Sequence, residues 1–491
     1  MALLLPQSSE MARIVVANSI GVDEEGYYII HSPSRWSSGV KKENHFTYYP
    51  WELAYLSSLL KKKTDHQVKF VDGNLNRWNW KRLADEICQF SPHFLIMEPS
   101  TRTILDDLKC IKKVKKETGS KIILVGQHAS ALPEWVKTEG ADYVVIGEYE
   151  KPLLRFFQGE GVEKIPGFYP NPPKELIDLD ELPFPEDEDV QRIAYGIPGE
   201  PSSDYLEIQA YASRGCWRSC SFCVARHIYY RKPLWRKRGI QKIIEEIKYL
   251  KKKYPQMQGI FFDEECHNGS EEFILELSKA IIENRLNKLK FEAMCDVGFL
   301  NKKILEAMKE AGYYQIRVGI ESASEKVLKG MNKKIEIHKV IKVLKTAKDL
   351  NFLTYGTFIV GGPLSTKEED MKTLELMKYL LMEGYLDKLQ VSILTPFPGT
   401  PFYKWVKEKG YLLPVEFWQF DGENFAVVSY PNYSSSQIKK MKEKMLKERD
   451  RLILKMRIKK GEFLSWVKDR FHKYGFIGGV KKGVVRILKT L

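Results

Sequence analysis

Apolar residues in this chain follow two alternating patterns. From about residue 12 to residue 160, short continuous apolar runs alternate with segments whose apolar positions recur at helical spacing. Such runs between helical segments are typical of strands buried in a parallel sheet. Five strand–helix units therefore predict a doubly wound, flavodoxin-like α/β domain. The expected strands are 13–17, 68–72, 94–97, 121–126 and 143–147, and the expected helices are 51–63, 81–90, 103–117 and 135–139.

A second series of the same kind occupies the centre of the chain. Six consecutive units favour a partial (β/α)6 barrel, a fold whose chemistry gathers at the carboxyl ends of the strands. We therefore expect domains at 12–160 and 205–425, a proline- and acid-rich linker at 161–204, and a helical basic region at 426–491. The expected barrel strands are 206–213, 259–263, 291–295, 315–321, 354–362 and 388–394, and the helices are 240–252, 273–284, 302–311, 337–350 and 368–383.

Composition narrows the class of protein. The chain has 491 residues, 43% of them hydrophobic, which suffices for more than one core. Seven cysteines in a chain of this length do not form a disulfide scaffold, so we expect a reducing, cytoplasmic location. A net charge of +14 favours anionic partners, or else is simply a lysine-rich solvated surface. No apolar run approaches the roughly 18 residues of a membrane-spanning helix.

Three cysteines stand close together at the start of the central series. Cys216, Cys220 and Cys223 have C-x3-C-x2-C spacing. Three thiolates on one loop can bind a 4Fe–4S cluster and leave one iron without a protein ligand. Two other interpretations stay open, a zinc site closed by His227 and reduced core thiols. The remaining thiols, Cys88, Cys110, Cys266 and Cys295, are expected to be buried core residues.

The segment Ser213-Arg-Gly-Cys-Trp-Arg-Ser-Cys-Ser-Phe-Cys223 resembles the cysteine loop of the radical S-adenosylmethionine (SAM) superfamily. The resemblance implies that the open iron chelates SAM and that an electron from the cluster cleaves SAM to a 5′-deoxyadenosyl radical. It also implies that Phe222 packs near the adenine ring. Further SAM contacts are implied at the ends of later strands, by Asp263, Glu264, Glu321, Ser322, Gly361 and Gly362, with a matching segment at Thr395–Pro401. Carboxylates suit an ammonium group and hydroxyls, and glycines permit close approach.

The N-terminal series is similar to the cobalamin-binding domain fused to many radical SAM enzymes. Three segments carry the similarity, Tyr49–Leu56, Val125–Ser130 and Val145–Glu150. The signature that supplies a histidine below cobalt is absent, which implies cobalt without a histidine ligand, faced by Asn74, Arg77 or Trp78. A flavodoxin-like domain that binds nothing is the alternative. The implied cobalamin-binding residues are Asp72, Asn74, Ser100, Gly126, Gln127, His128, Gly147 and Glu148.

Together the two resemblances imply a cobalamin-dependent radical SAM methyltransferase. One SAM would methylate cobalamin to methylcobalamin, and a second would yield the radical that activates an unactivated carbon to receive the methyl group. The same cofactors could instead serve a cyclase or ring-forming enzyme without methyl transfer. An alternative of another class is a cobalamin-binding sensor or carrier with a degenerate barrel.

Several partners are expected. The substrate is a small molecule, a lipid or a peptide, and the cluster needs an electron donor such as flavodoxin or ferredoxin. Residues 480–491 form a basic amphipathic pattern that suits peripheral membrane contact or, alternatively, docking on the barrel. No aromatic–basic module of the nucleic-acid-binding kind is visible in the sequence, so nucleic acid is disfavoured as a partner.

Overall fold

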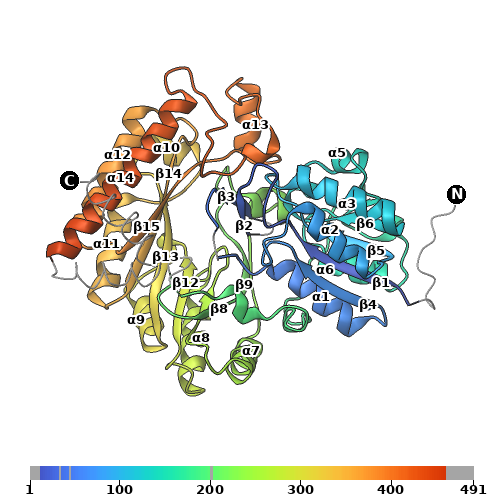
Figure 1. Cartoon of the computed structure of the whole chain (residues 1–491). Helices are drawn as coiled ribbons and strands as arrows, with labels where there is room; N and C mark the ends of the chain where they lie inside the picture. The colour runs from blue at the N-terminus through green and yellow to red at the C-terminus, as the bar shows by residue number, and fades with distance from the viewer. Residues whose placement is uncertain (1–10, 33–34, 44–45, 199–202, 460–491) are drawn as a thin grey trace.

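The N-terminal unit is a five-stranded parallel sheet. The computed structural model describes residues 11–32, 35–43, 46–198 and 203–459, and Figure 1 shows its two units side by side. The strand order of the first sheet is β4-β1-β5-β6-β7. Its elements are β1 (Arg13–Asn18), α1 (Trp51–Lys63), β4 (Gln67–Asp72), α2 (Trp80–Gln89), β5 (Phe94–Met97), α3 (Ile104–Thr118), β6 (Lys121–Leu124), α4 (Gly126–Ala131), α5 (Pro133–Thr138), β7 (Tyr143–Val144) and α6 (Glu150–Phe157).

Both faces of this sheet are covered by helices. In β1, Ile14 and Val16 belong to the core shared with α1 and α6, whereas Val15 and Ala17 belong to the core shared with α2 and α3. Alternate residues of a strand point to opposite faces, so a fully apolar strand needs two helical layers. The predicted doubly wound architecture is confirmed.

The central unit is a six-stranded parallel sheet with the order β15-β14-β13-β12-β11-β8. The predicted partial barrel is confirmed. Its elements are β8 (Glu207–Ala210), α7 (Ile240–Lys253), β11 (Gly259–Phe262), α8 (Glu271–Glu283), β12 (Lys290–Cys295), α9 (Lys302–Glu310), β13 (Tyr313–Glu321), α10 (Glu325–Gly330), α11 (Ile337–Asp349), β14 (Leu353–Val360), α12 (Lys367–Met382), β15 (Lys388–Ile393), α13 (Pro401–Glu408) and α14 (Ser435–Lys459).

The barrel strands separate an apolar outer face from a polar interior. Ile260 and Phe262 pack in the outer core, while Phe261 is on the other side of the same strand. In the interior, the Arg317 guanidinium lies 4.4 Å from the Phe261 ring centroid and 4.8 Å from that of Tyr355. It also forms a buried ion pair of 2.8 Å with Glu292. Aromatic faces and a carboxylate together compensate the desolvated cation.

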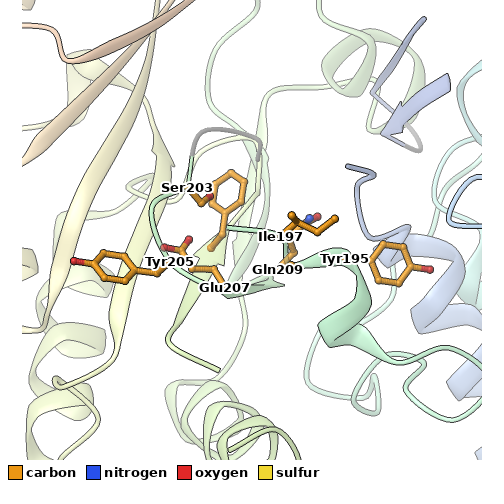
Figure 2. A pocket seen from close by; sticks show the side chains of 8 residues that line it. Tyr195, Ile197, Ser203, Tyr205, Glu207 and Gln209 are labelled. Carbon is orange, nitrogen blue, oxygen red and sulfur yellow. The ribbon is translucent and has the colours of Figure 1, made fainter. Parts of the chain in front are cut away.

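A small cavity lies at the amino-terminal end of β8 (Figure 2). Its volume of about 10 Å³ gives room for roughly one water molecule, far too little for a cofactor. Burial and the neighbouring Glu292 raise the pKa of Glu207, which lines this cavity with Ser203 and Gln209. The cavity is thus a feature of the barrel floor, at the end opposite to the predicted chemistry.

Two antiparallel hairpins were not predicted. The first is β2 (Tyr28–Ser32) with β3 (Trp36–Val40), and the second is β9 (Ser213–Cys216) with β10 (Leu234–Lys237). The single strand expected at 206–213 is therefore two strands, β8 and β9. The strand expected at 121–126 ends earlier because Gly126 adopts φ +83° and begins α4. Helices α4, α6 and α10 are short, and short segments carry too little periodicity for a sequence prediction.

The linker binds both units. Tyr195 donates a hydrogen bond of 2.6 Å to Asp72 at the end of β4, and Arg192 forms a buried 2.6 Å ion pair with Glu246 of α7. At the other end of the chain, α14 packs on α12 and β15. No helix among residues 11–32, 35–43, 46–198 and 203–459 is long and apolar enough to cross a membrane. The basic pattern at 480–491 lies outside the described residues, so its membrane contact stays a prediction.

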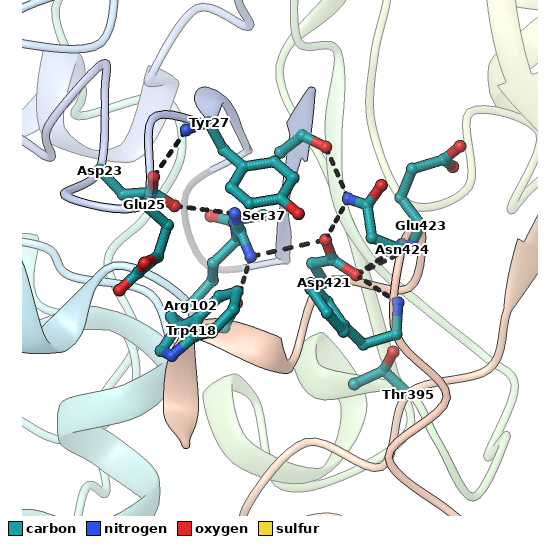
Figure 3. A network of polar contacts seen from close by, with 12 residues as sticks. Asp23, Glu25, Tyr27, Ser37, Arg102, Thr395, Trp418, Asp421, Glu423 and Asn424 are labelled. Carbon is teal, nitrogen blue, oxygen red and sulfur yellow. Dashed lines mark hydrogen bonds and ion pairs between the residues drawn. The ribbon is translucent and has the colours of Figure 1, made fainter. Parts of the chain in front are cut away.

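A buried arginine joins the N-terminal unit to the segment that follows the barrel (Figure 3). Arg102, in the loop after β5, forms ion pairs of 2.8 Å with Asp23 and 3.4 Å with Asp421. It also donates to the carbonyl of Trp418 and stacks 5.0 Å from the ring centroid of Tyr27. Its side chain is fully buried, so the cation is balanced by carboxylates from both units.

Replacing Arg102 is expected to destabilise the chain strongly. Arg102→Met leaves Asp23 and Asp421 buried without their cation, which typically costs about 3–5 kcal/mol. The midpoint of thermal unfolding reports the loss. Arg82→Met removes a surface pair with Glu86 and serves as the control, with an expected loss of about 0.5 kcal/mol or less. Equal effects of the two substitutions would contradict this role of Arg102.

Candidate cofactor site between the two sheets

The three clustered cysteines lie on one loop at the carboxyl-terminal side of the barrel. The loop runs from Cys216, the last residue of β9, to Cys223, just before the π-helix η3 (Ala225–Tyr229). Gly215 adopts φ +93°, and a Cβ there would meet the Leu234 carbonyl of β10. Burial raises the pKa of Cys220 to about 11 and that of Cys223 to about 12. These thiols therefore need a metal to become thiolates at neutral pH.

A fourth thiol lies beside this loop. Cys266 is fully buried, its thiol donates to Oδ1 of Asn268 at 3.6 Å, and its proximity lowers the pKa of Cys216. Sequence spacing gave no sign of this contact, because Cys266 lies 50 residues from Cys216. His227, the alternative fourth ligand, is engaged elsewhere, with Nε2 at 3.0 Å from the carbonyl of Cys220. No three His, Cys, Asp or Glu side chains gather around a single ion position in the described part of the chain.

Two adjacent carboxylates follow β11, Asp263 and Glu264, and the structure shows that they point in different directions. Asp263 faces the interior, where it accepts hydrogen bonds of 3.1 and 2.7 Å from Arg35 of the N-terminal unit. Glu264 is turned toward the barrel wall, where it contacts Ser213 and lies 2.6 Å from His267 Nδ1. Glu265, the alternative to Glu264 at this imperfectly matched position, accepts a 3.0 Å hydrogen bond from the amide of Gly215. Glu265 therefore contacts the cysteine loop, whereas Asp263 joins the two units.

The other predicted SAM contacts have protein partners in the structure. Glu321 adopts φ +63° and pairs at 3.0 Å with Lys333, while Ser322 bonds Thr373. The close approach expected at Gly361 is made by Ile438 of α14, which a Cβ would meet, and the neighbours of Gly362 are barrel side chains. Phe222 is half-buried against the barrel core. The glycines therefore serve helix packing, and the SAM roles of all these residues stay predictions.

At the edge of the N-terminal sheet, several predicted residues hold the loops together. Asp72 accepts from Asn18 at 3.0 Å as well as from Tyr195, and Asn74 bonds Thr47 and the carbonyls of Ile20 and Ile29. Arg77, also considered for the cobalt face, donates to the carbonyls of Ile29 and Phe46. Trp78 accepts through its carbonyl from Gly21. The side-chain polar atoms of Asp72, Asn74 and Arg77 are thus used by the protein itself.

Other predicted residues keep polar atoms for a ligand. Gln127 and His128 lie on α4 just past β6, and both are buried. Among the described residues, neither amide atom of Gln127 has a hydrogen-bond partner, nor does Nε2 of His128. Burial lowers the pKa of His128 to about 3, so the ring is neutral. Gly126 is required here because the Glu98 side chain packs where a Cβ would stand.

The remaining predicted positions connect the sheet edge to the cysteine loop. Ser100 bonds Ser37 of β3 at 2.7 Å. Gly147 adopts φ +76° and has the Tyr229 carbonyl close to where a Cβ would lie. Glu148 forms ion pairs of 2.6 Å with Arg214 and of 2.6 Å with Arg236, so its carboxylate joins the two units.

Sequence reasoning missed a set of buried polar groups where the two sheets meet. Trp51 of α1 stacks on Tyr211 with ring centroids 4.2 Å apart. In the described residues no partner is found for the Tyr211 hydroxyl, for either carboxylate oxygen of Glu52, or for Nε2 of His31. Burial, with the nearby Glu98, raises the pKa of Glu52 well above its usual range. A buried polar atom without a partner signals a missing ligand or water.

Known proteins match both units. A B12 binding domain family model matches residues 39–157, and a radical SAM superfamily model matches residues 211–377. This chain belongs to the cobalamin-dependent radical SAM enzymes. An uncharacterized methyltransferase of Pyrococcus horikoshii is 27% identical, with 92% of this chain and 96% of the relative covered. An anaerobic magnesium-protoporphyrin IX monomethyl ester cyclase of Cereibacter sphaeroides is 24% identical, with 77% and 62% covered.

Solved structures agree on the fold. The cobalamin-dependent SAM radical enzyme OxsB, with aqua-cobalamin and SAM bound, gives a TM-score of 0.68 at 15% identity and covers 90% of this chain and 67% of its own. The radical SAM methyltransferase TsrM of Kitasatospora setae, with cobalamin and a 4Fe–4S cluster, gives 0.63 at 17% identity and covers 82% and 78%. The arrangement of a B12-binding sheet beside a radical SAM barrel is thus shared.

The residues present fit the two cofactors. Three thiols on one loop are the ligand set of a 4Fe–4S cluster with an open iron. Glu265 offers an acceptor for the ammonium group of SAM beside that loop. Gln127, His128 and His31 offer unpartnered polar atoms for the amide groups of a corrinoid. Cofactor binding would therefore complete hydrogen bonds that the protein alone leaves open.

Cys266 is expected to tune the cluster rather than bind it. Cys266→Ala removes the polar thiol beside the Cys216 sulfur, so the midpoint potential of the cluster should become more negative while four irons remain. A redox titration followed by electron paramagnetic resonance measures the potential. The control is Cys295→Ala, another buried thiol, which should leave it unchanged. Loss of iron in the Cys266 variant would contradict a tuning role.

Glu52 should make the cofactor-free chain less stable as pH rises. Its pKa is raised by burial, so the neutral carboxyl is tolerated at low pH, and deprotonation above the unfolded-state pKa costs stability. Glu52→Gln should therefore raise the unfolding midpoint by more at pH 8 than at pH 5. Glu283→Gln, on an exposed side chain, is the control and should change neither. An equal gain at both pH values would argue against a carboxyl kept neutral by burial.

Proposed function

We propose that this enzyme transfers a methyl group to an unactivated carbon of a small-molecule, lipid or peptide substrate. The observation that carries the proposal is the direct contact between the two cofactor-bearing edges. Arg35 of the B12-binding domain pairs with Asp263 at the end of β11, and Trp51 stacks on Tyr211. A corrinoid and SAM held at these edges would face one shared space, as direct transfer requires.

The protein contributes positioning and the exclusion of water. When bound, SAM on a reduced cluster supplies a carbon radical, and cobalamin supplies a transferable methyl group. Trp51, Tyr211 and Tyr229 are buried and close the space where the units meet. Glu264 fixes the start of the cysteine loop through Ser213. Arg35 and Asp263 form the charged contact nearest the shared space, so they are the first candidates to orient a zwitterionic or polar ligand there.

A methyl-labelled SAM experiment tests the proposal before the substrate is known. Enzyme reconstituted anaerobically with a 4Fe–4S cluster and cobalamin is given labelled SAM and titanium(III) citrate. We expect labelled methylcobalamin, and 5′-deoxyadenosine once a substrate is present. Cys220→Ala should lose the nucleoside product because its cluster is incomplete.

The cyclase relative defines the competing outcome. If 5′-deoxyadenosine forms with product and the label reaches neither cobalamin nor product, methyl transfer is wrong and ring formation is favoured.

A further inference from the structure

The cysteine loop lies next to a surface with exposed apolar side chains. Trp217 directly follows Cys216, and its ring is 47% exposed although Nε1 donates to the carbonyl of Gly269 at 2.9 Å. Leu364 is 42% exposed and adopts φ +64°. It lies against Gly330, whose carbonyl accepts a 3.2 Å hydrogen bond from Ser221 of the loop. Trp217 and Leu364 thus both adjoin the cysteine loop, and an exposed tryptophan is typical of a protein-binding hot spot.

The same surface is positively charged. Arg226, Lys329 and Lys334 form no ion pair with any described residue. They adjoin the loop, since Arg226 donates to Ser219 and the Lys334 carbonyl accepts from Arg218 at 2.9 Å. We call Trp217, Arg226, Lys329, Lys334 and Leu364 the cluster-loop surface. The positive charge of this surface is one part of the net charge of +14 that the whole chain carries.

The carboxylates around this surface do not cancel its charge. Asp296 is paired with Arg218 at 2.7 Å, and Glu321 is paired with Lys333 at 3.0 Å. Two exposed carboxylates lie nearby, Glu325 on α10 and Glu272 three residues after Gly269, while the exposed Lys326 adds a further positive charge. The surface therefore complements an acidic partner.

The position of the surface indicates what that partner delivers. Cys216 and Cys223 are half-buried, so the cluster that they would hold lies just beneath the loop. Electron transfer slows steeply with distance, and an external donor reaches the cluster by the shortest path through this face. Exposed apolar side chains, together with lysines and an arginine that are unpaired in the described part of the chain, suit a docked protein better than a small reductant, which needs no surface of its own.

We propose that the cluster-loop surface docks an acidic one-electron carrier protein of the flavodoxin type. The inference rests on the proposed function only in requiring a cluster that must be reduced. The carrier's flavin hydroquinone gives up one electron, the cluster passes from its 2+ to its 1+ state, and no bond is formed or broken. Trp217 and Leu364 supply the apolar contact, and the basic residues steer the acidic carrier and set its orientation.

Stopped-flow reduction of the reconstituted enzyme tests this docking site. The probe is an acidic flavodoxin in its hydroquinone form, and the signal is the bleaching of the cluster's visible absorption, checked by electron paramagnetic resonance. Lys329→Glu with Lys334→Glu should lower the second-order rate constant about tenfold or more at low salt and flatten its salt dependence. Trp217→Ala should lower it about fivefold to tenfold at low and at high salt.

A matched control uses lysines at the opposite end of the barrel. Lys251 and Lys252 are exposed in the last turn of α7, just before the chain re-enters the sheet at the amino-terminal end of β11. Lys251→Glu with Lys252→Glu makes the same change in net charge and should leave the flavodoxin rate nearly unchanged. Reduction by dithionite, which needs no docking, should be the same in every variant.

Binding gives a readout that does not depend on the cluster's reactivity. The affinity for oxidised flavodoxin, measured by calorimetry at low salt, should fall in the Lys329/Lys334 variant and not in the Lys251/Lys252 variant. Equal flavodoxin rates and affinities in all variants would overturn the inference, as would an equal loss in the control. Failure of the proposed methyl transfer would appear differently, as normal flavodoxin-driven reduction without methyl label on cobalamin.

Discussion

One buried arginine connects the two halves of the reaction centre. Arg214 lies two residues before Cys216, and its guanidinium forms ion pairs of 2.6 Å with both Glu148 and Glu150 of the B12-binding domain. It also stacks 4.5 Å from the ring centroid of Trp51. Removing one partner of such a buried network typically costs about 3–5 kcal/mol. The cluster loop and the B12-binding edge are therefore held as one rigid assembly, and most of the site depends on this contact.

This assembly explains why so many polar groups are buried between the sheets. The ion pairs of Arg214, Arg35 and Arg102 join the units beside an apolar core that both units share, in which Trp51 packs with Tyr211 and Tyr229. Glu52, Gln127 and His31 are buried and keep polar atoms without a partner among the described residues. Two large polar cofactors would supply those partners. Cofactor binding should accordingly contribute to the stability of the chain as well as to its chemistry.

The two sheets contribute in different ways. The B12-binding sheet is covered by helices on both faces, so a ligand would contact it at the carboxyl ends of its strands. The barrel instead has a polar interior, in which Arg317 is clamped between Phe261 and Tyr355. A substrate carbon would have to lie between these regions for a radical to form and then meet the methyl donor. Trp51 and Tyr211 exclude water from this region, so water could not react with the radical or with the methyl donor.

The sequence by itself determined the architecture and the cluster loop. Apolar periodicity located both sheets, because buried parallel strands and the helices that cover them each require a characteristic spacing of apolar residues within a short segment. The spacing of Cys216, Cys220 and Cys223 is equally local, since one short loop holds all three. Only the tertiary structure decided which strand-end residues have polar atoms left for a ligand. Asp263 and Glu264 are adjacent in sequence, yet one faces Arg35 and the other His267. The contacts of Cys266 with Cys216 and of Glu148 with Arg214 join distant segments, and no local pattern records which side chains folding brings together.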